Sequence, residues 1–165
     1  MATGTGRFGR YSGGMLLALG ADHAGYALKA VIADHVRMLG HEVLDLGTTD
    51  ATTSVDYPDF GAAVGRAVAS GQADLGICVC GSGIGIAIAA NKVDGVRAAT
   101  VTDVTSARLC REHNHANVVC FGARLTGEAV VLDAVEAYLA ASPSTERHGR
   151  RVAMLADLEQ TNRKS

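Results

Sequence analysis

A cysteine followed at once by a glycine-rich turn is the part of this sequence best suited to chemistry. Cys80 ends a run of apolar residues, and the sequence GSGIG follows it at positions 81–85. Glycines at alternate positions allow several backbone N–H groups to converge on one bound oxygen, and a helix that begins there adds positive dipole. A helix N-terminus also raises the ionised fraction of a nearby thiol. The segment therefore indicates an anion-binding turn with a reactive thiol, and a simple strand-to-helix turn is the alternative.

This turn matches none of three common glycine-rich motifs. A Walker A loop would need Gly-Lys followed by Ser or Thr, and the dinucleotide fingerprint would need glycine at Ile86. A nucleophile elbow would need glycine at Cys80. The ligand of the turn therefore has to be inferred from other residues.

Acidic, histidine and arginine side chains elsewhere in the chain are candidates to complete such a site. Asp22 and His23 follow the first apolar run, although an aspartate there is also typical of a helix N-cap. His113 opens the polar run HNHAN at 113–117. Arg147 and Arg151 are four residues apart and share one helical face, where they would either clamp a phosphate or belong to a solvated charged helix.

A metal site is a further alternative, and it would draw on Asp22, His23, Cys80, His113 and His115. The spacing of these residues matches no recognised zinc pattern. We therefore predict that the protein uses neither a metal nor another cofactor.

Short apolar runs alternate with longer segments of helical periodicity along the chain. The predicted strands are 15–19, 42–46, 75–80, 96–101 and 117–121, most of them apolar throughout, as in a parallel sheet covered on both faces. The predicted helices are 26–39, 60–69, 84–91, 105–113 and 128–141, with a charged helix at 145–160. This alternation predicts a three-layer α/β/α domain, in which ligands bind beyond the carboxyl ends of the strands. We expect one domain at 15–160, between a flexible leader at 1–14 and a tail at 161–165.

The composition is that of a globular protein without a broad field of charge. Hydrophobic residues make up 48% and charged residues 19% of the 165 residues, and the net charge is −2. The chain therefore lacks the basic field that attracts nucleic acids or membrane surfaces. Residues 1–14 contain no apolar core of a signal peptide, so we expect a cytoplasmic protein whose four cysteines are reduced.

Taken in order, these segments resemble one enzyme family. The matching segments are DH at 22–23, DYP at 56–58, CGSGIG at 80–85, AANK at 89–92, Arg97, HN at 113–114, GAR at 122–124 and RH…RV at 147–152. Through them the chain closely resembles the family of ribose-5-phosphate isomerase B, which also includes allose-6-phosphate and galactose-6-phosphate isomerases. The resemblance covers about residues 15–160. It implies a Rossmann-like five-stranded parallel sheet and a homodimer, sometimes paired into a tetramer.

The resemblance also implies an activity and a set of site residues. The expected reaction interconverts ribose 5-phosphate and ribulose 5-phosphate, a step of the pentose phosphate pathway, through a cis-enediolate. Cys80 would be the base that moves a proton between C2 and C1, and Ser82 and His113 would assist ring opening. The implied substrate-binding residues are Asp22, His23, Tyr57, Gly81, Gly83, Ile84, Gly85, Asn114, Arg124, Arg147 and Arg151. One branch of the family has no such cysteine and carries glutamate at the position of Ile86, so Cys80 favours the thiol branch.

Two other functions remain open from the sequence. The same chemistry on a six-carbon substrate, allose 6-phosphate or galactose 6-phosphate, would differ only in the depth of the pocket. A non-catalytic module that binds a sugar phosphate or a nucleotide would need the phosphate ligands but not Cys80, Ser82 and His113.

The predicted topology adds a constraint on the oligomeric state. Cys80 follows the third strand, whereas His113 precedes the fifth, so the two belong to opposite edges of a parallel sheet. A five-residue strand separates those edges by roughly 17 Å. If both groups act on one substrate, His113 must come from a second subunit across a two-fold interface.

Overall fold

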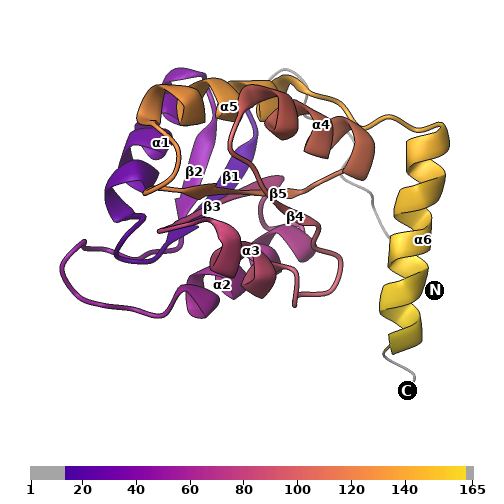
Figure 1. Ribbon diagram of the computed structural model, residues 1–165, viewed down its shortest axis with the longest axis horizontal. Coiled ribbons are helices and arrows are strands. Elements are labelled where there is room, and N and C mark those ends of the chain that lie inside the picture. Colours follow the sequence, from indigo (N-terminus) through magenta and orange to yellow (C-terminus); the bar gives the residue numbers. More distant parts are fainter. Residues whose placement is uncertain (1–13, 163–165) are drawn as a thin grey trace.

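The computed structural model describes residues 14–162, and within this range the chain forms five strands and six helices (Figure 1). The strands are β1 (Leu16–Ala21), β2 (Glu42–Asp45), β3 (Leu75–Cys80), β4 (Ala98–Thr100) and β5 (Val118–Gly122). The helices are α1 (Tyr26–Met38), α2 (Tyr57–Ala69), α3 (Ile84–Ala90), α4 (Val104–Asn114), α5 (Glu128–Ala140) and α6 (Arg147–Asn162). Apart from Gly14, the predicted leader lies outside the described residues, as do the last three residues of the predicted tail.

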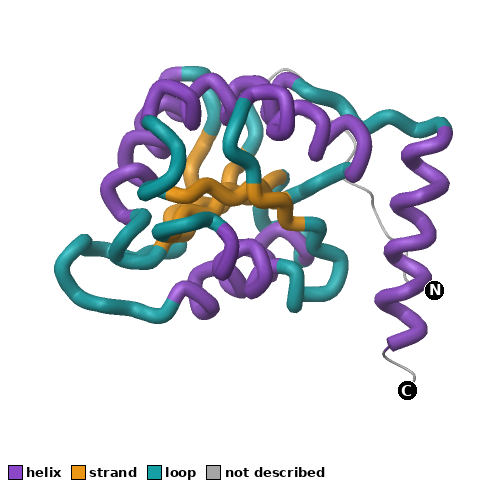
Figure 2. Tube along the Cα trace, viewed as in Figure 1, coloured by secondary structure: helices purple, strands orange, loops and turns teal. Residues whose placement is uncertain are grey.

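The sheet is parallel throughout and has the strand order β2-β1-β3-β5-β4. Helices α1, α4 and α5 cover one face and α2 and α3 cover the other, while α6 stands apart beside α4 (Figures 1 and 2). The predicted three-layer fold with a five-stranded parallel sheet and a C-terminal helix is confirmed.

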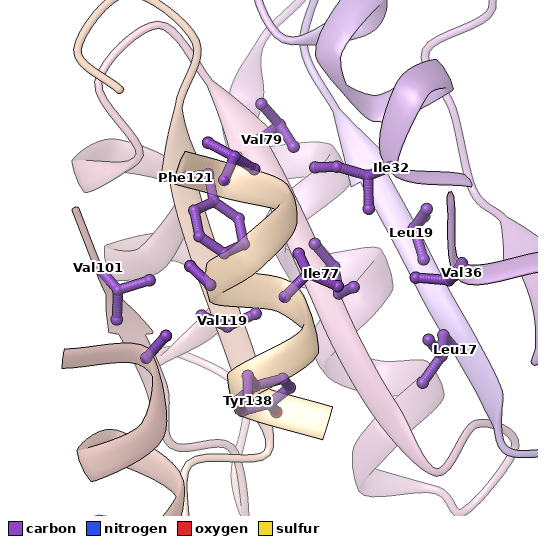
Figure 3. Close-up of a cluster of buried hydrophobic side chains, with 14 of the residues drawn as sticks. Leu17, Leu19, Ile32, Val36, Ile77, Val79, Val101, Val119, Phe121 and Tyr138 are labelled. Atoms are coloured by element: carbon purple, nitrogen blue, oxygen red, sulfur yellow. The ribbon is translucent and has the colours of Figure 1, made fainter. Parts of the chain in front are cut away.

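Alternation along the central strands divides their side chains between two apolar layers. Leu17, Leu19, Ile77 and Val79 point to the face covered by α1, α4 and α5, where they pack with Phe121 (Figure 3). The intervening residues, among them Cys78 and Cys80, belong to the layer under α2 and α3. Because both layers exclude water, β3 and β5 are buried along their whole length, which explains why these strands are apolar at nearly every position.

Most predicted boundaries differ from the structure by one or two residues, and two elements differ for identifiable local reasons. The helix predicted at 60–69 begins at Tyr57, because Pro58 fits the first turn, where its missing N–H is not needed. The strand predicted at 96–101 is reduced to Ala98–Thr100. At its start the N–H of Arg97 donates to the side chain of Asn117, at 2.7 Å. Neither change moves a predicted site residue to a different edge of the sheet.

None of the helices within residues 14–162 is long and apolar enough to cross a membrane.

Candidate active site

The turn between β3 and α3 holds the thiol of Cys80 close to backbone N–H groups. The N–H of Gly83 donates to Cys80 Sγ at 3.1 Å, a contact that stabilises negative charge on sulfur. Gly83 has φ = 76°. A Cβ at this position would lie 2.7 Å from the backbone carbon of Phe121, so the turn requires glycine.

This turn forms one wall of a cavity of about 480 Å³ at the carboxyl edge of the sheet. The residues that line the cavity are Asp22, Tyr57, Cys80, Gly81, Ser82, Ile84, Gly85, Arg124 and Leu125. All but Leu125 were predicted as site residues. Leu125 was missed because an apolar residue after Arg124 has no chemical signature in the sequence. The structure thus brings together segments that follow β1, β3 and β5 and the beginning of α2.

The backbone between strands fixes the polar residues of this cavity. Asp22 is buried, and its Oδ1 accepts a hydrogen bond from the N–H of Gly25 at 3.0 Å. The N–H of Arg124 donates to the carbonyl oxygen of Gly81 at 3.0 Å, which holds the arginine beside the turn. Its Nη1 would lie 3.2 Å from a Cβ at Gly81, so the guanidinium rests directly on the backbone there.

Tyr57 and His23 are positioned by similar close contacts. A Cβ at Gly85 would lie 2.7 Å from Cζ of Tyr57, so the absence of a side chain lets the phenol ring rest on the first turn of α3. His23 is not among the residues that line the cavity. Its Nδ1 accepts the N–H of Val55 at 3.2 Å, which leaves Nε2 as the ring nitrogen free to donate.

The remaining predicted residues form a second group at the amino edge of the sheet. His113 and Asn114 end α4, and Arg147 and Arg151 belong to the first turns of α6. The rings of His113 and His148 are stacked, with centroids 4.1 Å apart and an angle of 2° between their planes. The sequence indicated no role for His148, because one histidine among arginines on a charged helix has no specific signature.

The second group is strongly basic. Partial removal from water lowers the pKa of His148, and the positive charges of His113, Arg147 and Arg151 lower it further. Nε of Arg147 also contacts Nε2 of His148 at 3.4 Å. This concentration of cationic side chains is suited to an anion with several oxygen atoms, such as a phosphate.

The strand register keeps the two groups apart within one chain. In β5, Val118 pairs with Gly76 and Gly122 pairs with Cys80, so β5 runs from the His113 edge to the Cys80 edge. A strand of five residues spans roughly 17 Å. His113, Asn114, Arg147 and Arg151 accordingly do not line the cavity that contains Cys80.

The other three cysteines are free, buried thiols without access to that cavity. Burial raises the pKa of Cys110 to about 11 and that of Cys120 well above its ordinary value. Cys78 is fully buried and lies opposite Cys120 in the sheet. Within the described range, no three His, Cys, Asp or Glu side chains gather in a way that would hold a metal ion.

A groove elsewhere in the protein is larger than the cavity at Cys80 but lacks reactive groups. This groove, of about 590 Å³, runs along α2, and Arg66 is the sole charged residue among those that line it. It contains neither a thiol nor a histidine. Chemistry rather than volume therefore identifies the cavity at Cys80 as the candidate active site.

Comparison with known proteins shows the family to which the chain belongs. The chain belongs to the Ribose/Galactose Isomerase family, whose model matches residues 17–155. The predicted family and the prediction of an isomerase are confirmed.

Individual relatives match over nearly their whole length. Ribose-5-phosphate isomerase B of Escherichia coli is 42% identical over 144 residues, which are 87% of this chain and 96% of the relative. The structure of ribose-5-phosphate isomerase B from Clostridium thermocellum matches with a TM-score of 0.88 and 47% identity, covering 90% of this chain and 99% of that one. The enzyme from Mycoplasma genitalium with bound ribulose 5-phosphate matches with a TM-score of 0.85 and 36% identity, covering 88% and 96% of the two chains.

Proposed function

We propose that this protein interconverts ribose 5-phosphate and ribulose 5-phosphate through a cis-enediolate, with Cys80 as the base. The observation that carries the proposal is the contact of Cys80 Sγ with the N–H of Gly83 in a cavity lined by Ser82, Tyr57 and Arg124. The relatives named ribose-5-phosphate isomerase B, and the one solved with ribulose 5-phosphate, support this choice of substrate. The reaction belongs to the pentose phosphate pathway, and we expect it to take place in the cytoplasm.

The proposed chemistry moves one proton between neighbouring carbons. In the direction of the ketose, the thiolate of Cys80 removes the proton from C2 of the open-chain aldose. The electron pair passes to the carbonyl oxygen at C1, and the hydroxyl proton on the oxygen at C2 moves to the oxygen at C1. The enediolate then takes the carbon-bound proton back at C1, and the oxygen at C2 becomes the carbonyl. A carbon acid of this kind needs a base held out of water and hydrogen-bond donors aimed at the developing oxyanion. The N–H groups of the turn at 81–85 and the amide of Asn114 are the proposed donors.

The remaining residues open the sugar ring and bind the substrate. We assign ring opening to Ser82 and His113, the contacts with the sugar hydroxyl groups to Asp22 and Tyr57, and the phosphate to the cationic side chains. The proposed phosphate ligands are His23, Arg124, Arg147 and Arg151. No metal or other cofactor is required by this scheme, and the absence of a cofactor stays a prediction.

The scheme needs two subunits, because its residues are divided between opposite edges of the sheet. We therefore propose a homodimer in which His113, Asn114, Arg147 and Arg151 of one subunit complete the Cys80 cavity of the other. Exposed apolar side chains support such an interface. Ile84 and Ile88 on α3, and Leu155 and Leu158 on α6, are between 48% and 61% exposed. Apolar residues on these two helices would be covered by a second subunit.

A coupled isomerase assay tests the substrate. The purified protein is offered ribose 5-phosphate, allose 6-phosphate and galactose 6-phosphate, and Cys80→Ala protein is the control for contaminating activity. We expect kcat/KM to be highest with ribose 5-phosphate. A higher kcat/KM with either six-carbon substrate would move the assignment to that sugar. Absence of turnover with all three, despite binding of the sugar phosphates, would favour a non-catalytic binding module.

A further inference from the structure

His115 has an unusual backbone conformation directly after the proposed partner-facing residues. It follows Asn114 at the end of α4, with φ = 49° and ψ = 37°. Among residues 14–162 it is the one residue other than glycine with a positive φ. Such a conformation is uncommon for a residue with a side chain and persists where the surroundings hold it in place.

The ring of His115 is bonded to the segment that leads into α6. Its Nε2 lies 2.6 Å from the carbonyl oxygen of Ser144, a hydrogen bond in which the ring N–H donates. The N–H of Ser144 donates in turn to the carbonyl oxygen of Glu112 at 2.9 Å. Ser144 lies three residues before Arg147, so both of its bonds tie the beginning of α6 to the end of α4.

The backbone of His115 is itself fastened to the body of the protein. Its carbonyl oxygen accepts a hydrogen bond from Nε of Arg97 at 3.1 Å. The N–H of Arg97 donates to the side chain of Asn117, just before β5. His115 therefore links the segment just before β5, through its ring, to the segment that leads into α6, a helix that lies outside both layers and contacts the body mainly through α4 (Figure 1).

We infer that His115 is a positioning residue that holds the first turn of α6, and with it Arg147 and Arg151, in the orientation that receives the substrate phosphate. This inference rests on the proposed function, in which those arginines bind the phosphate. Without the ring, α6 would sample other orientations. Substrate would then bind only to the fraction of molecules in which the arginines are correctly oriented, here called the competent fraction. KM rises in inverse proportion to this fraction, whereas the proton transfer at Cys80 is unchanged once substrate is bound.

The test uses His115→Gly, which removes the ring but adopts a positive φ without strain. Loss of one hydrogen bond predicts a rise of about three- to tenfold in KM for ribose 5-phosphate, with kcat within roughly twofold of wild type. Hydrogen exchange measured by mass spectrometry should become faster in peptides covering 143–151. The matched control is His35→Ala, which removes a histidine that bridges α1 and α5 through Glu136 at 2.8 Å. It should leave both KM and the exchange of α6 unchanged.

Three results would overturn the inference: unchanged exchange in α6, unchanged KM, or a loss of kcat without a change in KM. His115→Asn, whose side chain also tolerates a positive φ, provides a second variant should His115→Gly fold poorly. If the wild-type protein isomerised no sugar phosphate, the proposed function would fail. The exchange experiment would still decide, in that case, whether His115 fastens α6.

Discussion

Cys80 differs from the other three cysteines in its surroundings rather than in its exposure. It is only 4% exposed, and Cys110 is 7% exposed. Cys80 faces a cavity and accepts an N–H from the following turn, whereas Sγ of Cys110 donates to the carbonyl oxygen of Ala107 at 3.1 Å. An acceptor role for sulfur suits a thiolate and a donor role suits a thiol.

Replacing Cys80 separates catalysis from packing. Cys80→Ala should lower kcat by at least the ~10²–10⁴-fold typical of a general acid–base group, with little change in thermal stability. Cys78→Ala removes a fully buried side chain from the core and should instead lower the free energy of unfolding by about 0.5–3 kcal/mol. Steady-state kinetics and thermal unfolding of both variants distinguish the two roles. Near wild-type turnover of Cys80→Ala would rule out the thiol as the base.

His148 provides a pH-dependent contribution to stability whose sign follows from its surroundings. Its pKa is lowered in the folded protein, so below its ordinary pKa of about 6.5 the unfolded chain binds a proton that the folded chain does not. The contribution is therefore fully present above that pH and declines as the pH falls towards the folded-state pKa. Thermal unfolding between pH 5 and 8 should show a decline that is smaller in His148→Gln. Identical pH profiles for the two proteins would contradict this assignment.

Helix α6 is the helix least embedded in the fold. Its contacts with the body include the His113–His148 stack, a hydrogen bond from the N–H of Gly95 to Glu159 at 2.9 Å, and packing against α4. A helix held in this way contributes little to the hydrophobic core of the domain. Its arginines are more readily explained by binding than by packing.

Substitution of these arginines tests that explanation. Arg147→Ala and Arg151→Ala should each weaken binding of a sugar phosphate by ~1.5–3 kcal/mol, the range for hydrogen bonds to a charged group. The effect should appear as a raised KM in steady-state kinetics. Arg37→Ala, which removes an exposed arginine paired with Asp34 on α1, is the control and should change neither constant. Unchanged kinetics in both α6 variants would indicate that the arginines belong to a solvated charged surface and do not bind the phosphate.

The residues around Cys80 and those around His113 are separated by the sheet, and this separation has a direct functional consequence. Cys80 and His113 lie at opposite edges of one sheet, yet the proposed reaction uses both on a single pentose phosphate. A two-fold interface would solve this problem, because the amino edge of each subunit would complete the cavity of the other. The dimer would then be the smallest unit with a complete site.

Mixing of two inactive variants tests the shared site. Cys80→Ala and His113→Ala should each be nearly inactive alone. Every mixed dimer, however, contains one site with both groups intact and one with neither. Random exchange makes half of the dimers mixed, so activity should recover to roughly a quarter of the wild-type value. Absence of recovery, with mixed dimers proven by native mass spectrometry, would contradict the shared site.

The fold class and most of the residues that line the cavity at Cys80 were predictable from the sequence. Apolar runs without alternation predicted buried parallel strands, because a strand covered on both faces has no polar side. The turn after Cys80 was also evident, because Gly83 has a positive φ and no room for a Cβ, requirements that glycine alone meets. Both features are local, so the residues next to one another in the sequence are sufficient to predict them.

Which residues meet in the folded protein could not be predicted from the sequence. The tertiary structure placed Leu125 in the cavity, stacked His148 on His113, and joined His115 to Ser144 across 29 positions of sequence. Such contacts depend on how layers pack and on where a helix leaves the domain, and no local pattern of residues encodes them. The edge of the sheet to which each group belongs was predictable from topology, since parallel strands all point the same way. The neighbours that each group finds at that edge were not, because they come from segments distant in the chain.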